Sequence, residues 1–330
     1  MDSGQLQRQY KEHLSDFKEW SQKEHCQEYI LYASNIGICV CIDETSLSNG
    51  ELFTVLTNRD AKTGKKCLIA MIRGTKCDNI SKILCKIPVS LRNKVKEVTV
   101  DMAANMHQVI KKCFPQAEAV VDRFHVQKLA IDGLQELRIT RRWEAINAEN
   151  KAIAVAKENN RPYIPMEFSN GDTPKQLLAR SRYLLFKSRE KWSESQKERA
   201  SILFREYPEI EKAYNLCHQL RCIFNQKQDK DVARGKLALW YNMADDFLLD
   251  TKDFKFRAKN DLSKIRSNPF HSVINSIKTY SEKILNFFNN RSTNAAAECF
   301  NAKLKAFRAD LRGVSDLSFF IYRVANIYAR

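Results

Sequence analysis

The sequence predicts an α/β fold in which a mixed five-stranded sheet, flanked by helices, is interrupted by a large all-α insertion. Three observations lead to this prediction. Strand patterns recur over residues 36–121, they are then missing until about residue 288, and a strong helical pattern follows. With 330 residues, 44% of them hydrophobic, the chain can build a substantial core. We expect four segments: an N-terminal helical segment (1–35), the first part of the sheet core (36–139), the insertion (140–288) and the C-terminal core helices (289–330).

The strand patterns have an order that predicts the topology of the sheet. They occupy residues 36–42, 52–56, 67–72, 95–100 and 118–121, and helical patterns lie at 78–86 and 102–113. Residues 58–66 favour a hairpin connection between the second and third strands. A hairpin followed by right-handed crossovers makes the later strands parallel to the first. The first, fourth and fifth strands should then lie side by side, which is the arrangement of an RNase-H-like sheet.

Helical patterns account for most of the remaining chain. Residues 5–31 predict an amphipathic helix before the sheet. The last helices are predicted after the N-cap residues Ser292 to Asn294, ending at Gly313, and over 317–328. The insertion is predicted to contain helices over 124–159, 175–187, 193–205, 209–225, 232–249 and 272–286.

Three acidic residues each follow a predicted strand: Asp43, Asp101 and Asp122. Ligands of open α/β sheets gather beyond the carboxyl ends of the strands. Carboxylates that meet there repel one another unless a cation neutralises them, and oxygen ligands suit Mg²⁺ or Mn²⁺. The alternative is that each aspartate only ends a strand, begins a turn or caps the next helix.

Two further residues are candidates for the same site. Glu298 lies on the predicted helix opposite its bulky stripe, on a face of small residues that could approach the edge of the sheet. The alternative is a solvent-exposed glutamate. His125 follows Asp122 by three residues, so the first turn of the next helix would bring both toward one site. The alternative is a histidine with a purely structural role.

The charge of the chain indicates a polyanionic partner. Lys and Arg number 55 against 39 Asp and Glu, a formal net charge of +16, which favours nucleic acid or an acidic membrane face. A soluble protein that is merely basic is the alternative. No apolar run approaches the roughly 18 residues of a membrane span, and residues 1–10 are polar, so we expect a cytosolic protein that does not bind membranes. The chain has no Walker or Gly-x-Ser-x-Gly motif, which argues against an ATPase loop or a serine hydrolase.

From about residue 36 to its end, the sequence resembles bacterial insertion-sequence transposases of the DDE superfamily, in particular the ISL-three family. The ordered set of matches is specific, although each match alone is weak. The matching segments are Ile42-Asp-Glu44, Val98-Thr-Val-Asp-Met102, Phe114-Pro115, Val121-Asp-Arg-Phe-His-Val126, Ser181-Arg-Tyr-Leu-Leu185, Ile284-Leu-Asn-Phe-Phe288 and Ser292-Thr-Asn-Ala-Ala-Ala-Glu-Cys-Phe-Asn301.

The resemblance implies a catalytic site and a reaction. Asp43, Asp101 and Glu298 would be the catalytic carboxylates that hold two divalent ions, Mg²⁺ or Mn²⁺, while Asp122 and His125 look like an Asp-x-x-His element beside them. The reaction would be cleavage and strand transfer of DNA during transposition of an insertion sequence. Two rival functions are a catalytically inactive DNA-binding protein derived from a transposase and a structure-selective nuclease.

The resemblance also implies partners. We expect the chain to bind double-stranded DNA, both transposon ends and target, as a homo-oligomer in the bacterial cytoplasm at the nucleoid. Relatives carry an N-terminal zinc-binding and helix-turn-helix region that has no counterpart here, so a separately encoded subunit could supply end recognition. Cys299 stands where relatives commonly have glycine, and a larger residue there could crowd the site. Expected DNA contacts, each alternatively part of a solvated basic face, are Arg138, Arg141, Arg142, Lys175, Arg180, Arg182, Lys303 and Lys305.

Overall fold

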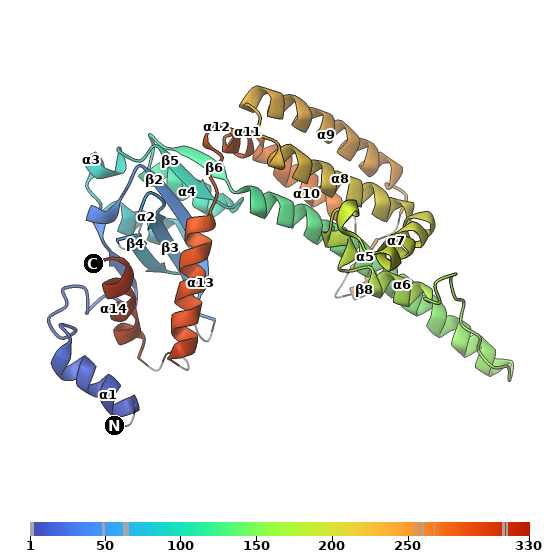
Figure 1. The fold of residues 1–330 in the computed structure, drawn as a ribbon, viewed down its shortest axis with the longest axis horizontal. Helices are drawn as coiled ribbons and strands as arrows, with labels where there is room; N and C mark the ends of the chain where they lie inside the picture. Colours follow the sequence, from blue (N-terminus) through green and yellow to red (C-terminus); the bar gives the residue numbers. More distant parts are fainter. Residues whose placement is uncertain are drawn as a thin grey trace. The chain divides into compact units, whose positions relative to one another are not determined.

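The computed structural model (Figure 1) describes residues 3–47, 50–61, 66–254, 256–258, 261–266, 268–311, 314 and 316–330. The chain forms two compact units. We call Met1–Asp122 with Glu282–Arg330 the sheet unit, and Arg123–Ser281 the helical unit. The sequence placed the two boundaries at residues 139/140 and 288/289. The first boundary lies earlier because helix α5 (Arg123–Glu158) runs unbroken for 36 residues and belongs to the helical unit from its first residue.

A six-stranded mixed sheet is the centre of the sheet unit, with the strand order β1-β4-β3-β2-β5-β6. Strands β2, β5 and β6 are parallel neighbours, while β2, β3, β4 and β1 pair antiparallel. The expected adjacency of the first, fourth and fifth predicted strands is confirmed, and the unit is an RNase-H-like core. The strands are β1 (Tyr29–Leu31), β2 (Cys39–Ser46), β3 (Leu52–Asn58), β4 (Leu68–Arg73), β5 (Glu97–Val100) and β6 (Glu118–Val121).

The N-terminal segment differs from the predicted helix over 5–31. Helix α1 (Ser3–Gln9) continues as a π-helical turn only to Leu14, and β1 then adds a sixth strand beside β4. The apolar residues of the stretch between them pack on the core instead of forming one helical stripe: the rings of Phe17 and Phe319 lie 5.2 Å apart. Tertiary packing and strand pairing therefore override the helical periodicity. The predicted hairpin over 58–66 and the predicted helix end at Gly313 fall partly or wholly outside the described residues.

The two faces of the sheet carry different layers of helices. Val40, Ile42, Val98 and Val100 face α2 (Cys77–Leu84) and α4 (Ala104–Cys113) in one apolar cluster. On the other face, α13 (Ala295–Asp310) and α14 (Leu317–Tyr328) pack on β3 and β4 in a second cluster. Figure 1 shows α13 lying across the sheet, with α14 beside it. Short helices α3 (Val89–Arg92), α11 (Ser281–Leu285) and α12 (Phe287–Asn290) complete the connections.

Helices α5 to α10 build the helical unit around buried side chains such as Trp240, Phe224 and Phe270. The unit is not purely α-helical: strands β7 (Phe256–Ala258) and β8 (Asp261–Arg266) form a separate two-stranded sheet. These strands were missed because β7 has only three residues and the six residues of β8, Asp-Leu-Ser-Lys-Ile-Arg, are mostly polar and do not alternate. The remaining helices are α6 (Pro174–Arg180), α7 (Glu194–Glu206), α8 (Pro208–Asn225), α9 (Lys230–Asp250) and α10 (Pro269–Thr279). Among the described helices of the chain, none is long and apolar enough to cross a membrane.

Candidate active site

The register of the central strands aligns the three aspartates. Parallel pairing of β2 with β5 runs to Cys41↔Thr99, and pairing of β5 with β6 runs to Val100↔Val121. Continuing both registers places Asp43 beside Asp101 and Asp101 beside Asp122. Asp43 does not end its strand, as the sequence suggested, because β2 continues to Ser46 by pairing with β3 (Asp43↔Val55). Asp43 instead lies just beyond the point where β2 and β5 separate.

The three aspartates also share one face of the sheet. Successive residues of a strand point to opposite faces. Asp43 therefore shares the face of Cys41, and Asp101 that of Thr99. This is the face opposite Val40, Val98 and the α4 helix, and therefore the face on which α13 packs.

Asp43 and Asp101, which are both half-buried, are held by hydrogen bonds. The Glu44 N–H donates to Asp43 Oδ1 at 2.9 Å, and the Asn301 side-chain amide donates to Asp43 Oδ2 at 2.8 Å. The Ala103 N–H donates to Asp101 Oδ1 at 2.8 Å, just before α4 begins. Asp101 thus does stabilise the turn into the next helix, but one of its carboxylate oxygens suffices for that role.

Helix α13 is anchored to the strands that carry the aspartates. Asn301 joins it to Asp43, and just before its start Asn290 donates to Glu97 of β5 at 3.1 Å. Ala297, Phe300 and Leu304 are at most 3% exposed. The sequence expected the small-residue face, with Ala295, Ala302 and Ala309, to approach the sheet. Those alanines are exposed, because the bulky stripe provides far more apolar area to bury.

Glu298 lies on α13 between its two contacts with the strands. Its neighbour Ala297 is buried, with its backbone near Cys41, and Asn301 follows one turn later. The Glu298 side chain is exposed. Within the part of the chain that the structure describes, no three His, Cys, Asp or Glu side chains are grouped closely enough to hold a metal ion. That Glu298, Asp43 and Asp101 bind a common metal ion therefore stays a prediction.

Sequence reasoning missed three polar residues at this site. Asn301 carried no signal beyond its place in the matched motif. Glu44 follows Asp43, and its pKa is raised by burial and by the nearby charges of Asp101 and Asp43. Burial and the Lys283 charge lower the pKa of His107 on α4 to about 4, so this neighbour of Asp101 is neutral at pH 7. The place of His107 in the helix after the strand-end Asp101 could have drawn attention to it, but nothing in the sequence could have shown that it is buried.

The predicted Asp-x-x-His element spans the junction of the two units. Asp122 is 0% exposed at the end of β6, where its N–H donates to the Val100 carbonyl at 3.0 Å. His125 is half-buried in the first turn of α5, in the helical unit. That the side chains of Asp122 and His125 act together stays a prediction.

The expected DNA contacts differ widely in their surroundings. Arg138 is 4% exposed and donates to Gln135 and to the Leu178 carbonyl, which does not fit a phosphate contact. Arg141 is also mostly buried between two glutamates. Lys175 and Arg180 are more exposed but form ion pairs with Glu149 and Asp172. Exposed side chains for which no ion pair is seen among the described residues are Arg142, Arg182, Lys303 and Lys305.

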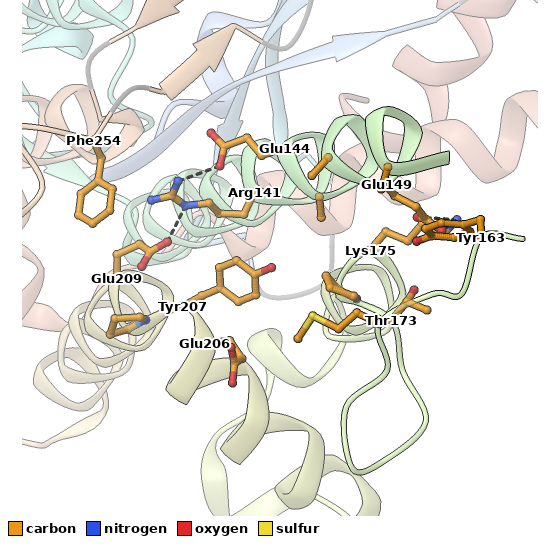
Figure 2. Close-up of a pocket in the computed structure, with 16 residues that line it drawn as sticks. Arg141, Glu144, Glu149, Tyr163, Thr173, Lys175, Glu206, Tyr207, Glu209 and Phe254 are labelled. Atoms are coloured by element: carbon orange, nitrogen blue, oxygen red, sulfur yellow. Dashed lines mark hydrogen bonds and ion pairs between the residues drawn. The ribbon is translucent and has the colours of Figure 1, made fainter. Parts of the chain in front are cut away.

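A large cavity lies in the helical unit (Figure 2), with a volume of about 690 Å³. Figure 2 shows Arg141 between Glu144 and Glu209, with distances of 2.8 and 2.6 Å. A second ion pair in the wall of the cavity joins Lys175 Nζ to a carboxylate oxygen of Glu149 at 2.8 Å. Two basic side chains therefore face three acidic ones at the wall, and the rest of the lining includes Glu206, alanines of α5 and Met166. The cavity contains none of the candidate carboxylates.

Comparisons with known proteins identify the family of the chain. A search of curated proteins found no match. Among solved structures, the chain is similar to the Drosophila P element transposase strand transfer complex, with 14% identity, a TM-score of 0.40, and coverage of 100% of this chain and 85% of that one. A family model described as a transposase, of the ISL-three type of DDE enzymes, matches residues 40–324. Because this match includes most of the chain, the protein belongs to the ISL-three family of DDE transposases.

Proposed function

We propose that the protein is an active transposase that cleaves DNA and joins the resulting 3′ end to a target, with Asp43, Asp101 and Glu298 as its catalytic carboxylates. The observation that carries the proposal is the anchoring of α13. Asn301 donates to Asp43 directly, and the register of β2 and β5, continued two residues beyond its last pair, would bring Asp101 beside Asp43. Glu298 is one helical turn from Asn301, and residues three apart are neighbours on a helix surface, so Glu298 would have to turn toward the aspartates to share an ion with them.

The residues at this edge of the sheet fit divalent metal ions. Their donor atoms are all oxygens, which Mg²⁺ and Mn²⁺ prefer. The raised pKa of Glu44 reports burial and the negative charges of Asp101 and Asp43 around it, which a cation would offset. Asp43, Asp101 and Glu298 would hold two such ions, and the ions would activate the attacking oxygen and stabilise the leaving oxygen.

The surrounding residues prepare this site. The Glu44 N–H and the Asn301 amide fix the orientation of the Asp43 carboxylate, and the Ala103 N–H fixes that of Asp101. The exposed Lys303 and Lys305 on α13 and Arg142 and Arg182 in the helical unit would bind the DNA backbone. Double-stranded DNA, as transposon end and target, is the proposed partner, bound by a homo-oligomer at the bacterial nucleoid.

The test is a strand-transfer assay with the purified full chain, a labelled end of the element and plasmid target in Mn²⁺. We expect nicking at the end and joined products, both lost with EDTA. Nicking without joining would favour a nuclease. DNA binding without either product would favour a catalytically inactive DNA-binding protein derived from a transposase. In that case Cys299→Gly, which restores the glycine that relatives commonly have beside the glutamate, would be tested for recovery of activity.

Replacing Asn301 tests whether it orients Asp43. Asn301→Ala removes the amide that donates to Asp43 Oδ2. Loss of a residue that orients a metal ligand typically costs about 10- to 100-fold in metal affinity or activity. We expect a loss of nicking of that size that is partly recovered at higher Mn²⁺ concentration, with DNA affinity unchanged. The control is Ala302→Ser at the exposed neighbouring position; an Asn301→Ala enzyme with the wild-type Mn²⁺ dependence would exclude the positioning role.

A further inference from the structure

A second cavity of the helical unit, about 500 Å³ in volume, is lined by both aromatic and basic side chains. It lies between α7, α8 and the turn before them. We call it the Arg189 pocket. Its principal lining residues are Arg189, Trp192, Lys197, Phe204, Arg205 and Glu211. Cavities of this size accommodate small organic groups.

The guanidinium of Arg189 forms a flat platform in this pocket. Its central carbon lies 5.4 Å from the ring centre of Phe204, 5.6 Å from that of Tyr214 and 5.9 Å from that of Trp192. Arg189 Nη2 also donates to Glu211 and to Asn215, each at 3.0 Å. Rings and acceptors together hold the guanidinium in place, while its side chain remains 47% exposed. A planar, partly exposed guanidinium is a surface on which another planar group can stack.

The aromatic residues behind Arg189 are themselves fixed. The ring of Tyr214 lies 5.5 Å from that of Trp192 and 5.6 Å from that of Phe204. Trp192 Nε1 donates to the Leu184 carbonyl at 2.8 Å, and the Tyr214 hydroxyl donates to the Lys187 carbonyl at 2.9 Å. The platform is therefore preorganised, and a ligand would not have to order it at the cost of binding energy.

Basic side chains line the rim of the Arg189 pocket, and each of them forms an ion pair with a glutamate. Lys197 and Arg205 lie two turns apart on one face of α7, with Ser201 between them. Lys197 pairs with Glu194 and Arg205 with Glu206, but both basic side chains are more than half exposed. Exposed ion pairs contribute little energy, so a phosphate can replace the carboxylate partners. Among the lining residues three cations stand against one acid, Glu211.

We propose that the Arg189 pocket binds an unpaired nucleotide of a DNA strand. The base would stack on the Arg189 guanidinium beside Phe204 and Trp192, and the flanking phosphates would contact Lys197 and Arg205. Aromatic and arginine platforms inside a basic groove are the arrangement that binds single-stranded nucleic acid. A paired base inside a duplex has both faces covered by its neighbours, so only an unpaired base can enter a concave pocket. The inference rests on the proposed function, because it takes DNA as the partner.

The test measures DNA affinity of the full chain in EDTA, so that binding is read without cleavage. Three fluorescent duplexes of one sequence are compared: blunt, with a short unpaired overhang, and with the same overhang lacking its bases. We expect the overhang to bind about tenfold tighter than the blunt duplex, and the abasic overhang to lose most of this gain, since stacking contributes about 1–3 kcal/mol per base. Arg189→Lys, which keeps the charge and loses the plane, should abolish the preference and leave blunt-duplex affinity within about twofold.

Arg323→Lys is the matched control, because the Arg323 guanidinium also lies over a ring, 4.8 Å from the centre of Phe307, but outside the pocket. It should retain the overhang preference. A wild-type chain that binds all three duplexes equally, or an Arg189→Lys variant that keeps the preference, would overturn the inference while leaving the proposed function intact. A free mononucleotide that binds as tightly as the overhang would assign the pocket to a soluble nucleotide instead and also overturn it. Failure of the wild-type chain to bind any of the duplexes would contradict both the inference and the proposed function.

Discussion

Replacing Asp101 by asparagine is expected to lower Mn²⁺-dependent nicking and joining by about a thousandfold or more, because one anionic ligand of the transition-state site is lost. Asparagine keeps an oxygen that can accept from the Ala103 N–H, so the turn into α4 should survive. The measurement is the single-turnover rate of end cleavage, with DNA affinity determined in parallel and expected to be unchanged.

The matched control for Asp101→Asn is Asp78→Asn. Asp78 is in the same unit, its side chain is 93% exposed, and it pairs only with Lys112 in the described structure. Its replacement should leave the rate of cleavage unaltered. If Asp101→Asn retained more than about a tenth of the wild-type rate, a role for Asp101 as metal ligand would be ruled out.

Replacing Phe300 by alanine is expected to lower the free energy of unfolding of the sheet unit by about 3–5 kcal/mol, the usual cost of truncating a buried phenylalanine. Phe300 is 3% exposed in the cluster that joins α13 to β3 and α14, and its ring lies 5.1 Å from that of Tyr328. Denaturant unfolding of the full chain, followed by circular dichroism, measures the change.

Cys299→Ala provides the comparison for Phe300→Ala at the adjacent position. Cys299 is exposed, and surface substitutions usually change stability by about 0.5 kcal/mol or less. Because Phe300 packs the helix that carries Glu298, activity should fall together with stability in the first variant and not in the second. Equal unfolding curves for the two variants would mean that α13 is not held to the sheet as described.

The strands were predictable because the sheet is buried on both faces. Segments 36–42 and 67–72 are apolar runs bounded by polar residues, and that pattern can be recognised without knowing the partner strand. β1 was not predictable in this way. Its three residues lie within an amphipathic pattern. Only their pairing with β4, in which Ile30 lies opposite Met71, makes them a strand.

The site was predictable only in part. Strand-end positions selected Asp43, Asp101 and Asp122 as candidates, and the resemblance added Glu298; their roles stay predictions. The face of α13 that meets the sheet was misjudged, because small residues permit close approach but Phe300 and Leu304 release more free energy on burial. Likewise, Arg138 is buried against α6, where it donates to the Leu178 carbonyl 40 residues further along the chain. Arg180 pairs with Asp172 in the loop before its own helix, so charge alone overstated the availability of both arginines to DNA.

The most direct test of the account counts the Mn²⁺ ions held by the protein bound to a DNA end that lacks its 3′ hydroxyl. Electron paramagnetic resonance titration of free Mn²⁺ gives this number for the wild type and for Asp43→Asn, Asp101→Asn and Glu298→Gln. We expect two ions per active site in the wild type and loss of at least one in each variant. Unchanged stoichiometry and affinity in all three variants would contradict the assignment of these carboxylates as the metal ligands.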